Sequence, residues 1–420
     1  MQSSPSAPRR ERASSALFFR LAWRNLWRNR KRTLIACASI FFAVFLSAVV
    51  SSTQSGQNEY LINTTVGFST GFIQIHGRNF WEKRSLDQAM EMDSALAKKA
   101  RTIDHVTQVV PRFETISLIA HGTVTKVSPV IGIDPVSENA MTGLGKRVVR
   151  GTPLAQWHHG AILAAGLAHM LGADVGDSVI IYGQGYQGVT AAGVIPVAAI
   201  VHFPIPDADN AMLYLPLGEA QDLYAAPSRV TALAIMLDSE DAMDDVARQL
   251  RGFAGQGLEI MTWREMMPEL VQAIIANNGG TVIMLLILYV VIGFGIFGTV
   301  MMMTMERRRE FGISIALGMK RWRLMYITVL EALMVSMLGA LSGIAASIPL
   351  IVYFYEYPIT LGGDYGKAML AYGMEPIIPF SIAPTVFTVQ GLIVFGLGIV
   401  SALYPVLIIR NLVPVQAMRG

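Results

Sequence analysis

The stretch Thr33–Ser52 reads TLIACASIFFAVFLSAVVSS and carries no charged residue over 20 positions. A helix of about 20 apolar residues crosses a bilayer core of about 30 Å, so this stretch predicts a transmembrane helix. Three further stretches have the same character, and Glu331 is the one charged residue inside them. These stretches are Thr281–Met305, Met325–Tyr355 and Pro384–Ile409.

The composition of the whole 420-residue chain agrees with a membrane protein. Hydrophobic residues make up 53% of the chain and charged residues 15%, whereas soluble domains carry about 25% charged residues. Such a composition excludes a disordered or collagen-like chain and argues against a wholly soluble enzyme. Cys37 is the single cysteine, which excludes an intramolecular disulfide and a cysteine-cluster metal site.

Basic residues give the expected orientation. Many arginines precede Thr33, and the link between the second and third hydrophobic stretches contains Arg307, Arg308, Arg309, Lys320, Arg321 and Arg323. The loop between the third and fourth stretches contains only Lys367 as a basic residue. The positive-inside rule therefore places the N-terminus, the basic link and the C-terminus in the cytoplasm.

The segment between the first two hydrophobic stretches has the composition of a folded extracytoplasmic domain. Short β-branched runs predict strands at Val127–Ile133, Ser178–Tyr182, Val194–Val201 and Thr231–Leu237. Helical patterns occur at Leu86–Arg101, Ala161–Leu171, Leu217–Tyr224 and Trp263–Ala276. Asn277-Asn278-Gly279-Gly280 then interrupts the chain before the second span, as either a hinge or a frayed connection.

The predicted fold class is a membrane α-helical protein with four transmembrane helices. A large mixed α/β periplasmic domain is inserted between the first and second of these helices. The expected segments are a cytoplasmic N-terminal segment with an amphipathic helix (1–32), the first span (33–53), the periplasmic domain (54–278), the second span (279–305), a cytoplasmic basic link (306–323), the third span (324–355), a periplasmic loop (356–383), the fourth span (384–410) and a cytoplasmic tail (411–420).

The N-terminal segment has two interpretations. Phe19, Trp23, Leu26 and Trp27 recur at helical spacing, with arginines on the other face, which favours a helix at the membrane surface. An ordinary packed helix explains the same pattern, because tryptophan also packs well against neighbouring helices. Leu34-Ile35-Ala36-Cys37 resembles a lipoprotein cleavage box, but the hydrophobic run follows Cys37 instead of preceding it, which favours a buried thiol.

Motifs for catalysis are not evident. Gly183–Gly188 matches G-x-G-x-x-G, yet the following residues predict a returning strand rather than a helix, so a glycine-rich hairpin is expected instead of a dinucleotide site. No phosphate-binding G-x-x-x-x-G-K-[ST] motif occurs, and the seven histidines are scattered. We expect no enzymatic activity, cofactor, metal site or nucleic-acid binding. Glu331 is either functional or paired with nearby cations.

The residues around the second and third spans resemble the FtsX/MacB/LolC-type permeases of ABC transporters. Glu306-Arg307-Arg308-Arg309-Glu310-Phe311-Gly312, Ala316-Leu317-Gly318 and Leu330-Glu331-Ala332-Leu333 are similar to a run shared by that family. Tyr404-Pro405 and Pro414–Arg419 resemble its closing motif. Ala161–Val179 and Met212–Asp222 are similar to the periplasmic region of the lipoprotein-releasing permeases LolC and LolE. Gly298 and a short hairpin after Tyr182 depart from the pattern.

The resemblance implies a permease that pairs with a second permease, identical or homologous, and with two copies of a separate ATPase. The basic link would then couple to the ATPase, whereas a purely topogenic loop would explain its arginines but not its glycine spacing. The implied coupling residues are Glu306, Arg307, Arg308, Arg309, Glu310, Gly312, Gly318, Lys320 and Arg321.

Three functions remain open. The leading hypothesis is the extraction of lipoproteins or other amphiphilic substrates from the inner membrane, with a periplasmic carrier or adaptor as a further partner. Acyl chains of substrate or membrane lipid would contact Phe41, Phe42, Phe45, Met284 and Leu288, or these residues simply face lipid. The alternatives are a MacB-like efflux permease for peptides or small toxins and an FtsX-like signalling scaffold that activates a periplasmic enzyme.

Overall fold

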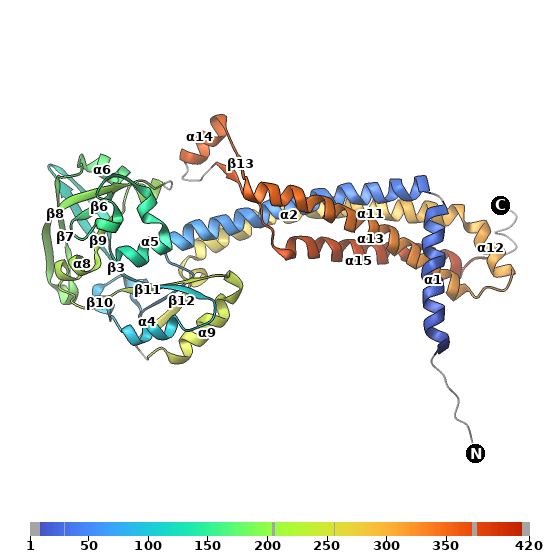
Figure 1. Cartoon of the computed structure of the whole chain (residues 1–420), viewed down its shortest axis with the longest axis horizontal. Coiled ribbons are helices and arrows are strands. Elements are labelled where there is room, and N and C mark those ends of the chain that lie inside the picture. The colour runs from blue at the N-terminus through green and yellow to red at the C-terminus, as the bar shows by residue number, and fades with distance from the viewer. Residues whose placement is uncertain (1–8, 29, 204–205, 256, 372–375, 414–420) are drawn as a thin grey trace, which may run out of the picture. The chain divides into compact units, whose positions relative to one another are not determined.

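The computed structural model describes residues 9–28, 30–203, 206–255, 257–371 and 376–413. These residues form two compact units (Figure 1). The helical unit contains Met1–Glu59, Ile275–Ile359 and Ile378–Gly420, and the α/β unit contains Tyr60–Ile274 and Thr360–Ile377. The predicted residues Pro414–Arg419 lie outside the described part of the chain.

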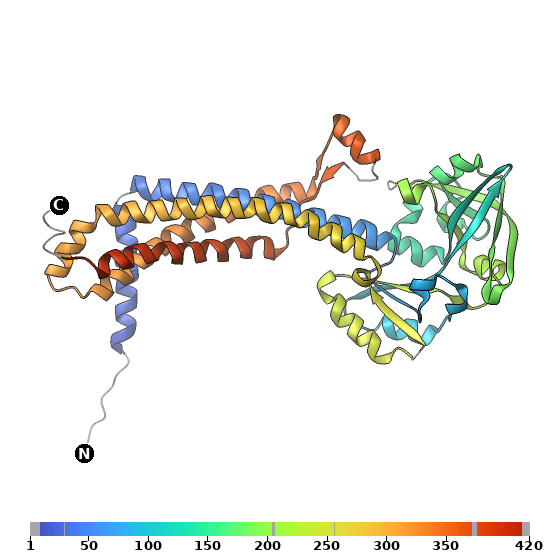
Figure 2. The same ribbon diagram turned by 180° about the vertical axis from the view of Figure 1, so that it is seen from behind.

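Long helices dominate the helical unit, as both views of the ribbon show (Figures 1 and 2). They are α1 (Arg9–Arg28), α2 (Arg30–Phe68), α11 (Pro268–Glu306), α12 (Arg308–Ala316), α13 (Arg321–Glu356) and α15 (Pro384–Arg410). Four of them, α2, α11, α13 and α15, are long and apolar enough to cross a membrane. The boundary between the two units falls inside α2 and inside α11, so both helices belong partly to each unit.

Two glycines allow α13 to pack closely against α2. A Cβ atom on Gly339 would lie 2.7 Å from the Cβ of Ile40, and one on Gly343 would lie 2.8 Å from the carbonyl oxygen of Phe41. Glycines four positions apart allow helix backbones to approach closely in membranes. A hydrophobic core of α2, α11, α13 and α15 side chains, which includes Val44, Ile296 and Val394, fills the bundle.

A buried polar group joins three of these helices. Gln390 on α15 is fully buried, and its Oε1 accepts hydrogen bonds from Ser47 of α2 at 2.9 Å and from Tyr289 of α11 at 2.8 Å. Polar side chains that satisfy one another between apolar helices help to fix their register.

The α/β unit is built on a ten-stranded sheet in the order β12-β1-β11-β3-β4-β9-β6-β8-β5, with β7 pairing with β3 and β8. The strands are β1 (Ile73–Gly77), β3 (Val106–His121), β4 (Val124–Ile133), β5 (Val148–Gly151), β6 (Ala161–Ala164), β7 (Ser178–Gln184), β8 (Thr190–Val201), β9 (Leu213–Pro216), β11 (Ala232–Leu237) and β12 (Leu258–Thr262). Two short two-stranded sheets pair β2 (Met90–Glu91) with β10 (Arg229–Val230) and β13 (Ile359–Thr360) with β14 (Ile377–Ile378).

Short helices connect the strands. They are α3 (Phe80–Lys83), α4 (Ser94–Ala100), α5 (Pro135–Thr142), α6 (Ala165–Leu171), α7 (Pro206–Asp209), α8 (Leu217–Leu223), α9 (Met243–Phe253), α10 (Trp263–Met266) and α14 (Gly363–Ala371). The buried side chains form two cores, one around Phe113, Trp157 and Ile162, the other around Ile75, Leu250 and Trp263. The long strand β3 connects them, because it pairs with β4 on one side and with β11 on the other.

The predicted strands agree with β4, β7, β8 and β11, and Gly183–Gly188 lies in the β7–β8 hairpin as expected. Three helix predictions are only partly correct. The range 86–101 is broken, because Met90 pairs with Val230 and Asp93 caps a new helix through the backbone N–H of Ala95. The range 161–171 begins as strand β6, since Ile162 pairs with Tyr214.

The third correction concerns the connection into the second span. The helical pattern at 263–276 breaks at Met267, where α10 ends before Pro268 begins α11. From there α11 is continuous through Gly279 and Gly280, so the structure contains neither a hinge nor a frayed connection at this point. Hydrogen bonds from Gln54 at 2.9 Å and Asn58 at 2.8 Å to Asn278 Oδ1 hold this part of α11 to α2.

Candidate functional site

The predicted coupling residues form a bend between two long helices. Glu306 ends α11, Arg307 caps α12, and the turn after α12 contains Gly318 at φ 95°, a left-handed conformation that glycine adopts without strain. Lys320 then caps α13. This segment, residues 306–321, is called the elbow below. It consists of one short helix, α12, with a turn at each end.

A buried carboxylate anchors the start of the elbow. Glu331 of α13 is 5% exposed, and the guanidinium of Arg307 donates a hydrogen bond to its Oε2. The side-chain amide of Asn25 on α1 donates to the other oxygen, Oε1, at 2.7 Å. Glu331 is therefore paired with a cation, as one of the two sequence interpretations expected. A buried carboxylate that loses such partners is strongly destabilising.

A second, more exposed contact ties the elbow to α1. Arg28 donates hydrogen bonds to Oε1 and Oε2 of Glu310 at 2.6 and 2.7 Å, and Arg307 donates to Oε2 at 3.3 Å. The hydrogen bond from Arg28, with a further contribution from Arg307, lowers the pKa of Glu310 below its usual range. Glu310 is therefore ionised at neutral pH and accepts hydrogen bonds from both guanidinium groups.

These residues enclose a small polar cavity in the helical unit. It has a volume of about 260 Å³, and its lining includes Asn25, Arg28, Arg307, Glu310 and Glu331. Both Asn25 and Arg28 come from α1 and were not among the residues predicted to form the site. The sequence indicates Asn25 and Arg28 only indirectly. The carboxylates of Glu310 and Glu331 need hydrogen-bond donors, and Arg307 is the donor close to Glu310 in the sequence.

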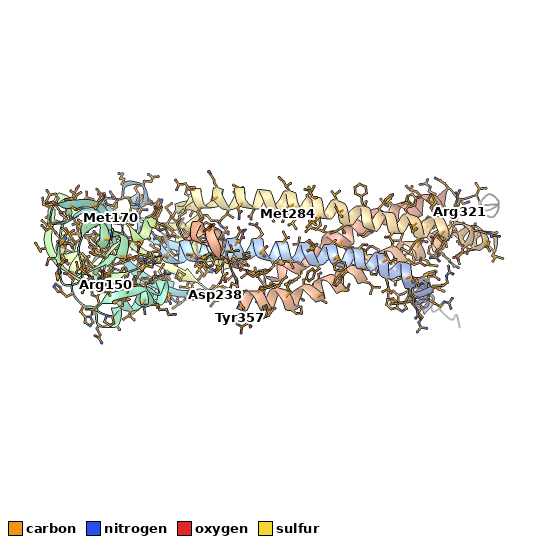
Figure 3. All side chains as sticks on the ribbon, turned by 90° about the horizontal axis from the view of Figure 1, so that it is seen from above. Arg150, Met170, Asp238, Met284, Arg321 and Tyr357 are labelled. Atoms are coloured by element: carbon orange, nitrogen blue, oxygen red, sulfur yellow. The ribbon has the colours of Figure 1, made fainter. Side chains whose placement is uncertain are left out.

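The remaining elbow residues differ in their exposure. Arg308, Arg309 and Lys320 are exposed, and Leu317 at the turn is 84% exposed, whereas Gly312 is buried beside Phe311. Arg321, labelled in Figure 3, is engaged within the unit, because its guanidinium donates to the carbonyl oxygens of Arg410 and, at 2.9 Å, of Leu412. The exposed cations and the exposed Leu317 are therefore available to a partner.

The predicted substrate-contacting residues lie on α2 and α11. On α2, the Phe41 ring packs edge-on against Phe42 at 5.1 Å and stacks on Phe45 at 6.2 Å. Met284 on α11 is 44% exposed (Figure 3), and Leu288 is half-buried. Phe42 is 62% exposed, and Phe41 and Phe45 are half-buried.

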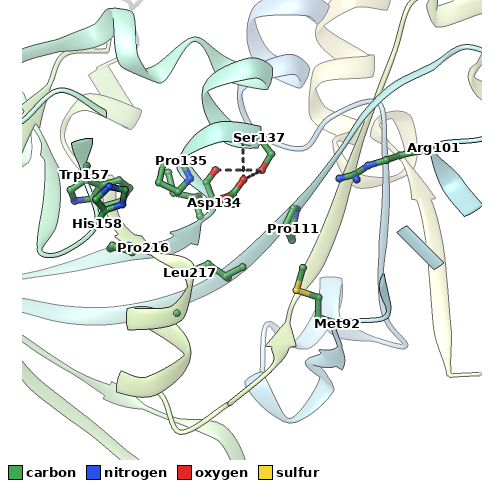
Figure 4. A pocket seen from close by; sticks show the side chains of 12 residues that line it. Met92, Arg101, Pro111, Asp134, Pro135, Ser137, Trp157, His158, Pro216 and Leu217 are labelled. Atoms are coloured by element: carbon green, nitrogen blue, oxygen red, sulfur yellow. Dashed lines mark hydrogen bonds between the residues drawn. The ribbon is translucent and has the colours of Figure 1, made fainter. Parts of the chain in front are cut away.

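The described residues of the α/β unit enclose a cavity beside Trp157 and another beside Gln74. The larger, of about 420 Å³, lies between Trp157, Asp134 and Met92 (Figure 4). Three of its polar residues are engaged with neighbours in the chain: Asp134 accepts hydrogen bonds from the backbone N–H of Ser137 at 3.0 Å and from its hydroxyl at 2.7 Å, and the Trp157 indole donates to Gly160 at 3.1 Å. The smaller, of about 350 Å³, contains Gln74 and Trp81 in its lining.

Metal-ligating groups do not converge in the described part of the chain. Across residues 9–28, 30–203, 206–255, 257–371 and 376–413, no three His, Cys, Asp or Glu side chains come together as ion ligands.

Known protein families match most of the chain. Residues 33–253 match the MacB-like periplasmic core domain, and residues 282–414 match the C-terminal part of FtsX-like permeases. The chain is 23% identical to the lipoprotein-releasing system transmembrane protein LolC of Neisseria meningitidis over 407 residues, which cover 92% of this chain and 94% of that protein.

Other relatives are covered only in part. The syringafactin export ATP-binding/permease protein SyfD of Pseudomonas syringae is 23% identical over 81% of this chain and 52% of its own length. The macrolide export ATP-binding/permease protein MacB of Campylobacter jejuni is 29% identical over 35% of this chain and 21% of its own length.

Among solved structures, the periplasmic region of MacB from Actinobacillus actinomycetemcomitans aligns at a TM-score of 0.34 and 14% identity, over 49% of this chain and 94% of that one.

The two matched families cover the first hydrophobic helix, most of the α/β unit and the three later helices, including the elbow. The chain therefore belongs to the FtsX/MacB/LolC-type permeases of ABC transporters, a family of membrane permease subunits.

Proposed function

We propose that this permease converts ATP hydrolysis by a separate ATPase into movement of its α/β unit, and thereby extracts lipoproteins or similar amphiphiles from the inner membrane. The observation that carries this proposal is the match to a lipoprotein-releasing LolC over nearly the full length of both chains. In this proposal all four long helices span the membrane, and the α/β domain between the first two is periplasmic. The termini and the elbow lie in the cytoplasm.

The elbow supplies the proposed contact with the ATPase. Arg308, Arg309 and Lys320 present exposed positive charge, and Leu317 adds an exposed apolar contact between them. Charged groups at a protein interface favour one partner over others, and a buried apolar group adds affinity. The Arg307–Glu331 pair holds the elbow to α13, so a force on α12 is passed to the helical unit.

Movement of the α/β unit requires that ATP-bound ATPase binds one conformation of the permease better than another. Both α2 and α11 contribute residues to each unit, and each is one unbroken helix. We propose that these two helices carry the displacement. Two permeases, alike or homologous, would assemble with two ATPase copies, and a periplasmic carrier or adaptor would receive the substrate.

Reconstitution with the ATPase tests the coupling proposal. The double variant Arg308→Glu/Arg309→Glu should lose most substrate-stimulated ATP hydrolysis. The matched control Arg20→Glu/Arg24→Glu makes the same change of charge on exposed positions of α1 and should retain it. Equal activity of the two variants would refute a coupling role and leave the arginines as topological signals.

Orientation is tested on intact cells. With Cys37 replaced by alanine, a single cysteine at Leu317 should resist a membrane-impermeant thiol reagent and react only after the membrane is opened. Labelling of that cysteine in intact cells would overturn the proposed topology.

Efflux of peptides or small toxins is the second candidate, and the match of residues 33–253 to the MacB-like periplasmic core domain favours it. Depletion of the permease distinguishes the two functions. Lipoproteins retained in the inner membrane would support extraction, whereas normal lipoprotein sorting with impaired peptide export would support efflux. Photocrosslinking from Phe45 and Met284 tests contact with acyl chains, and adducts with phospholipid alone would count against a substrate path there.

A further inference from the structure

We infer that the α/β unit contains a binding site for a neutral, amide-bearing amphiphile, in the cavity of about 350 Å³ beside Gln74. This inference goes beyond the proposed function and does not depend on coupling to an ATPase. It stands on three observations: a buried amide without a partner, a neutralised set of charges and apolar walls that continue onto an exposed face of the sheet.

The buried amide belongs to Gln74 in the middle of β1. This residue is 0% exposed and pairs through its backbone with β11 on one side and β12 on the other. Neither Oε1 nor Nε2 of its side chain has a hydrogen-bond partner among the residues that the structure describes. Buried amides are nearly always hydrogen-bonded, and leaving one unpaired is destabilising. The N–H of a ligand amide can donate to Oε1 of Gln74, and its carbonyl oxygen can accept a hydrogen bond from Nε2.

The charged residues of the cavity are already paired. Arg112 donates to both oxygens of Glu138, at 2.9 and 2.6 Å, and its other donors reach the carbonyl oxygens of Phe68 and Ser69. Arg84 forms an ion pair with Glu114 at 3.5 Å. A ligand with a net charge would lack a counter-ion here and would lose hydration on entry. The site therefore selects an uncharged polar group.

Apolar side chains form the rest of the wall. Phe68, Trp81, Ile131 and Met212 line the cavity, and Ile116, which is 57% exposed, lies at its edge. Such a mixture of apolar walls and a few polar groups is typical of small-molecule sites of 300–1,000 Å³.

The apolar surface continues from Ile116 along the sheet. Leu118, two residues further on β3, lies on the same face and is 40% exposed. It pairs with Val127 of β4 and with Tyr182 of β7, both of which are exposed. This row gives an apolar chain a surface to cover while the amide occupies the cavity. Among the described residues, the cavity beside Trp157 has no buried polar side chain without a partner in its lining, and its Asp134 and Trp157 are engaged within the protein.

Equilibrium binding of radiolabelled N-methyloctanamide to the full-length protein in nanodiscs tests the inference, with empty nanodiscs as the background. We expect saturable binding to the protein. The methyl ester of octanoic acid, which lacks the donor, should bind at least about tenfold more weakly, because a site built around a hydrogen bond rejects analogues that lack it. Octyltrimethylammonium should compete poorly because it is charged.

Gln74→Leu should reduce the affinity for the amide at least about tenfold and leave the protein as stable as before or more stable, since an unpaired buried amide is removed. The matched control is Gln108→Leu on β3, because Gln108 also has an unpartnered buried Oε1 among the described residues but does not line the cavity. This variant should bind the probe normally. Undiminished binding to Gln74→Leu, equal binding of the ester, or no saturable binding would overturn the inference.

Discussion

The guanidinium of Arg28 donates to both carboxylate oxygens of Glu310, although 282 positions separate the two residues in the chain. The contact joins α1, which precedes the first hydrophobic helix, to α12 in the elbow. Both side chains are about half exposed, so the contact itself adds little to stability, about 0.2–1 kcal/mol. The contact instead fixes the position of α1 against the elbow.

Charge exchange tests this role. Glu310→Arg should lower substrate-stimulated ATP hydrolysis in the reconstituted transporter, because two like charges would face each other. The double variant Arg28→Glu/Glu310→Arg should recover most of the activity, since the pair is restored with its signs exchanged. Thermal unfolding of all three proteins should differ little. Failure of the double variant to recover activity would show that Glu310 acts through another partner.

The pH dependence of the same contact follows from the lowered pKa of Glu310. A carboxyl group whose pKa falls on folding stabilises the fold above its unfolded value, about 4.3, and this contribution is lost as the pH falls through the lowered value. Spin labels at positions 24 and 317, with Cys37 replaced, should report one distance distribution from pH 8 to pH 5 and a broader one below about pH 4. A change between pH 5 and 8 would contradict the assignment. In Glu310→Gln the transition below pH 4 should be absent.

The Arg307–Glu331 pair should behave as a buried pair rather than a surface one. The side chains of Arg307 and Glu331 are 21% and 7% exposed. Arg307→Met leaves an uncompensated carboxylate and should destabilise the protein by about 3–5 kcal/mol, whereas Arg307→Met/Glu331→Leu should lie within about 1 kcal/mol of the parent. Unfolding in detergent measures both. If the single and double variants were equally destabilised, the lost stability would come from side-chain packing and not from the unpaired charge of Glu331.

Close packing at Gly339 gives a further prediction. Gly339→Leu places a side chain where Ile40 already stands, so it should lower stability by about 1–3 kcal/mol and separate α2 from α13. The control is Gly396→Leu on α15, where an added Cβ atom meets no neighbour within 4 Å among the described residues. Thermal unfolding in detergent should distinguish the two variants, and equal melting temperatures would refute the close contact.

The sequence predicted the elements that depend on local pattern. Apolar runs long enough to cross a bilayer gave the four helices, and short β-branched runs gave strands such as β7 and β8. Local pattern did not predict the secondary structure of segments that pair with residues far away in the sequence. Ile162 lies in an apolar run that suits either a helix or a strand, and its pairing with Tyr214, 52 positions away, makes it a strand.

The same limit applies to the site. The family resemblance identified Arg307, Glu310 and Glu331, but their partners Asn25 and Arg28 lie nearly 300 positions away in the chain. The sequence did not identify Gln74 as a candidate binding residue. Its importance follows only from the structure, where its buried side-chain amide lacks hydrogen-bond partners among the described residues.

The buried side chains of helix α11 follow one line along its length. Ile292, Ile296, Val300 and Thr304 are its buried residues, each four positions after the last, and only 11% of its most hydrophobic part is covered. The other faces of α11 are uncovered, whereas α2 and α13 fill each other's surface at Gly339. A second protein subunit that binds α11 on those faces would therefore displace no contact within the bundle.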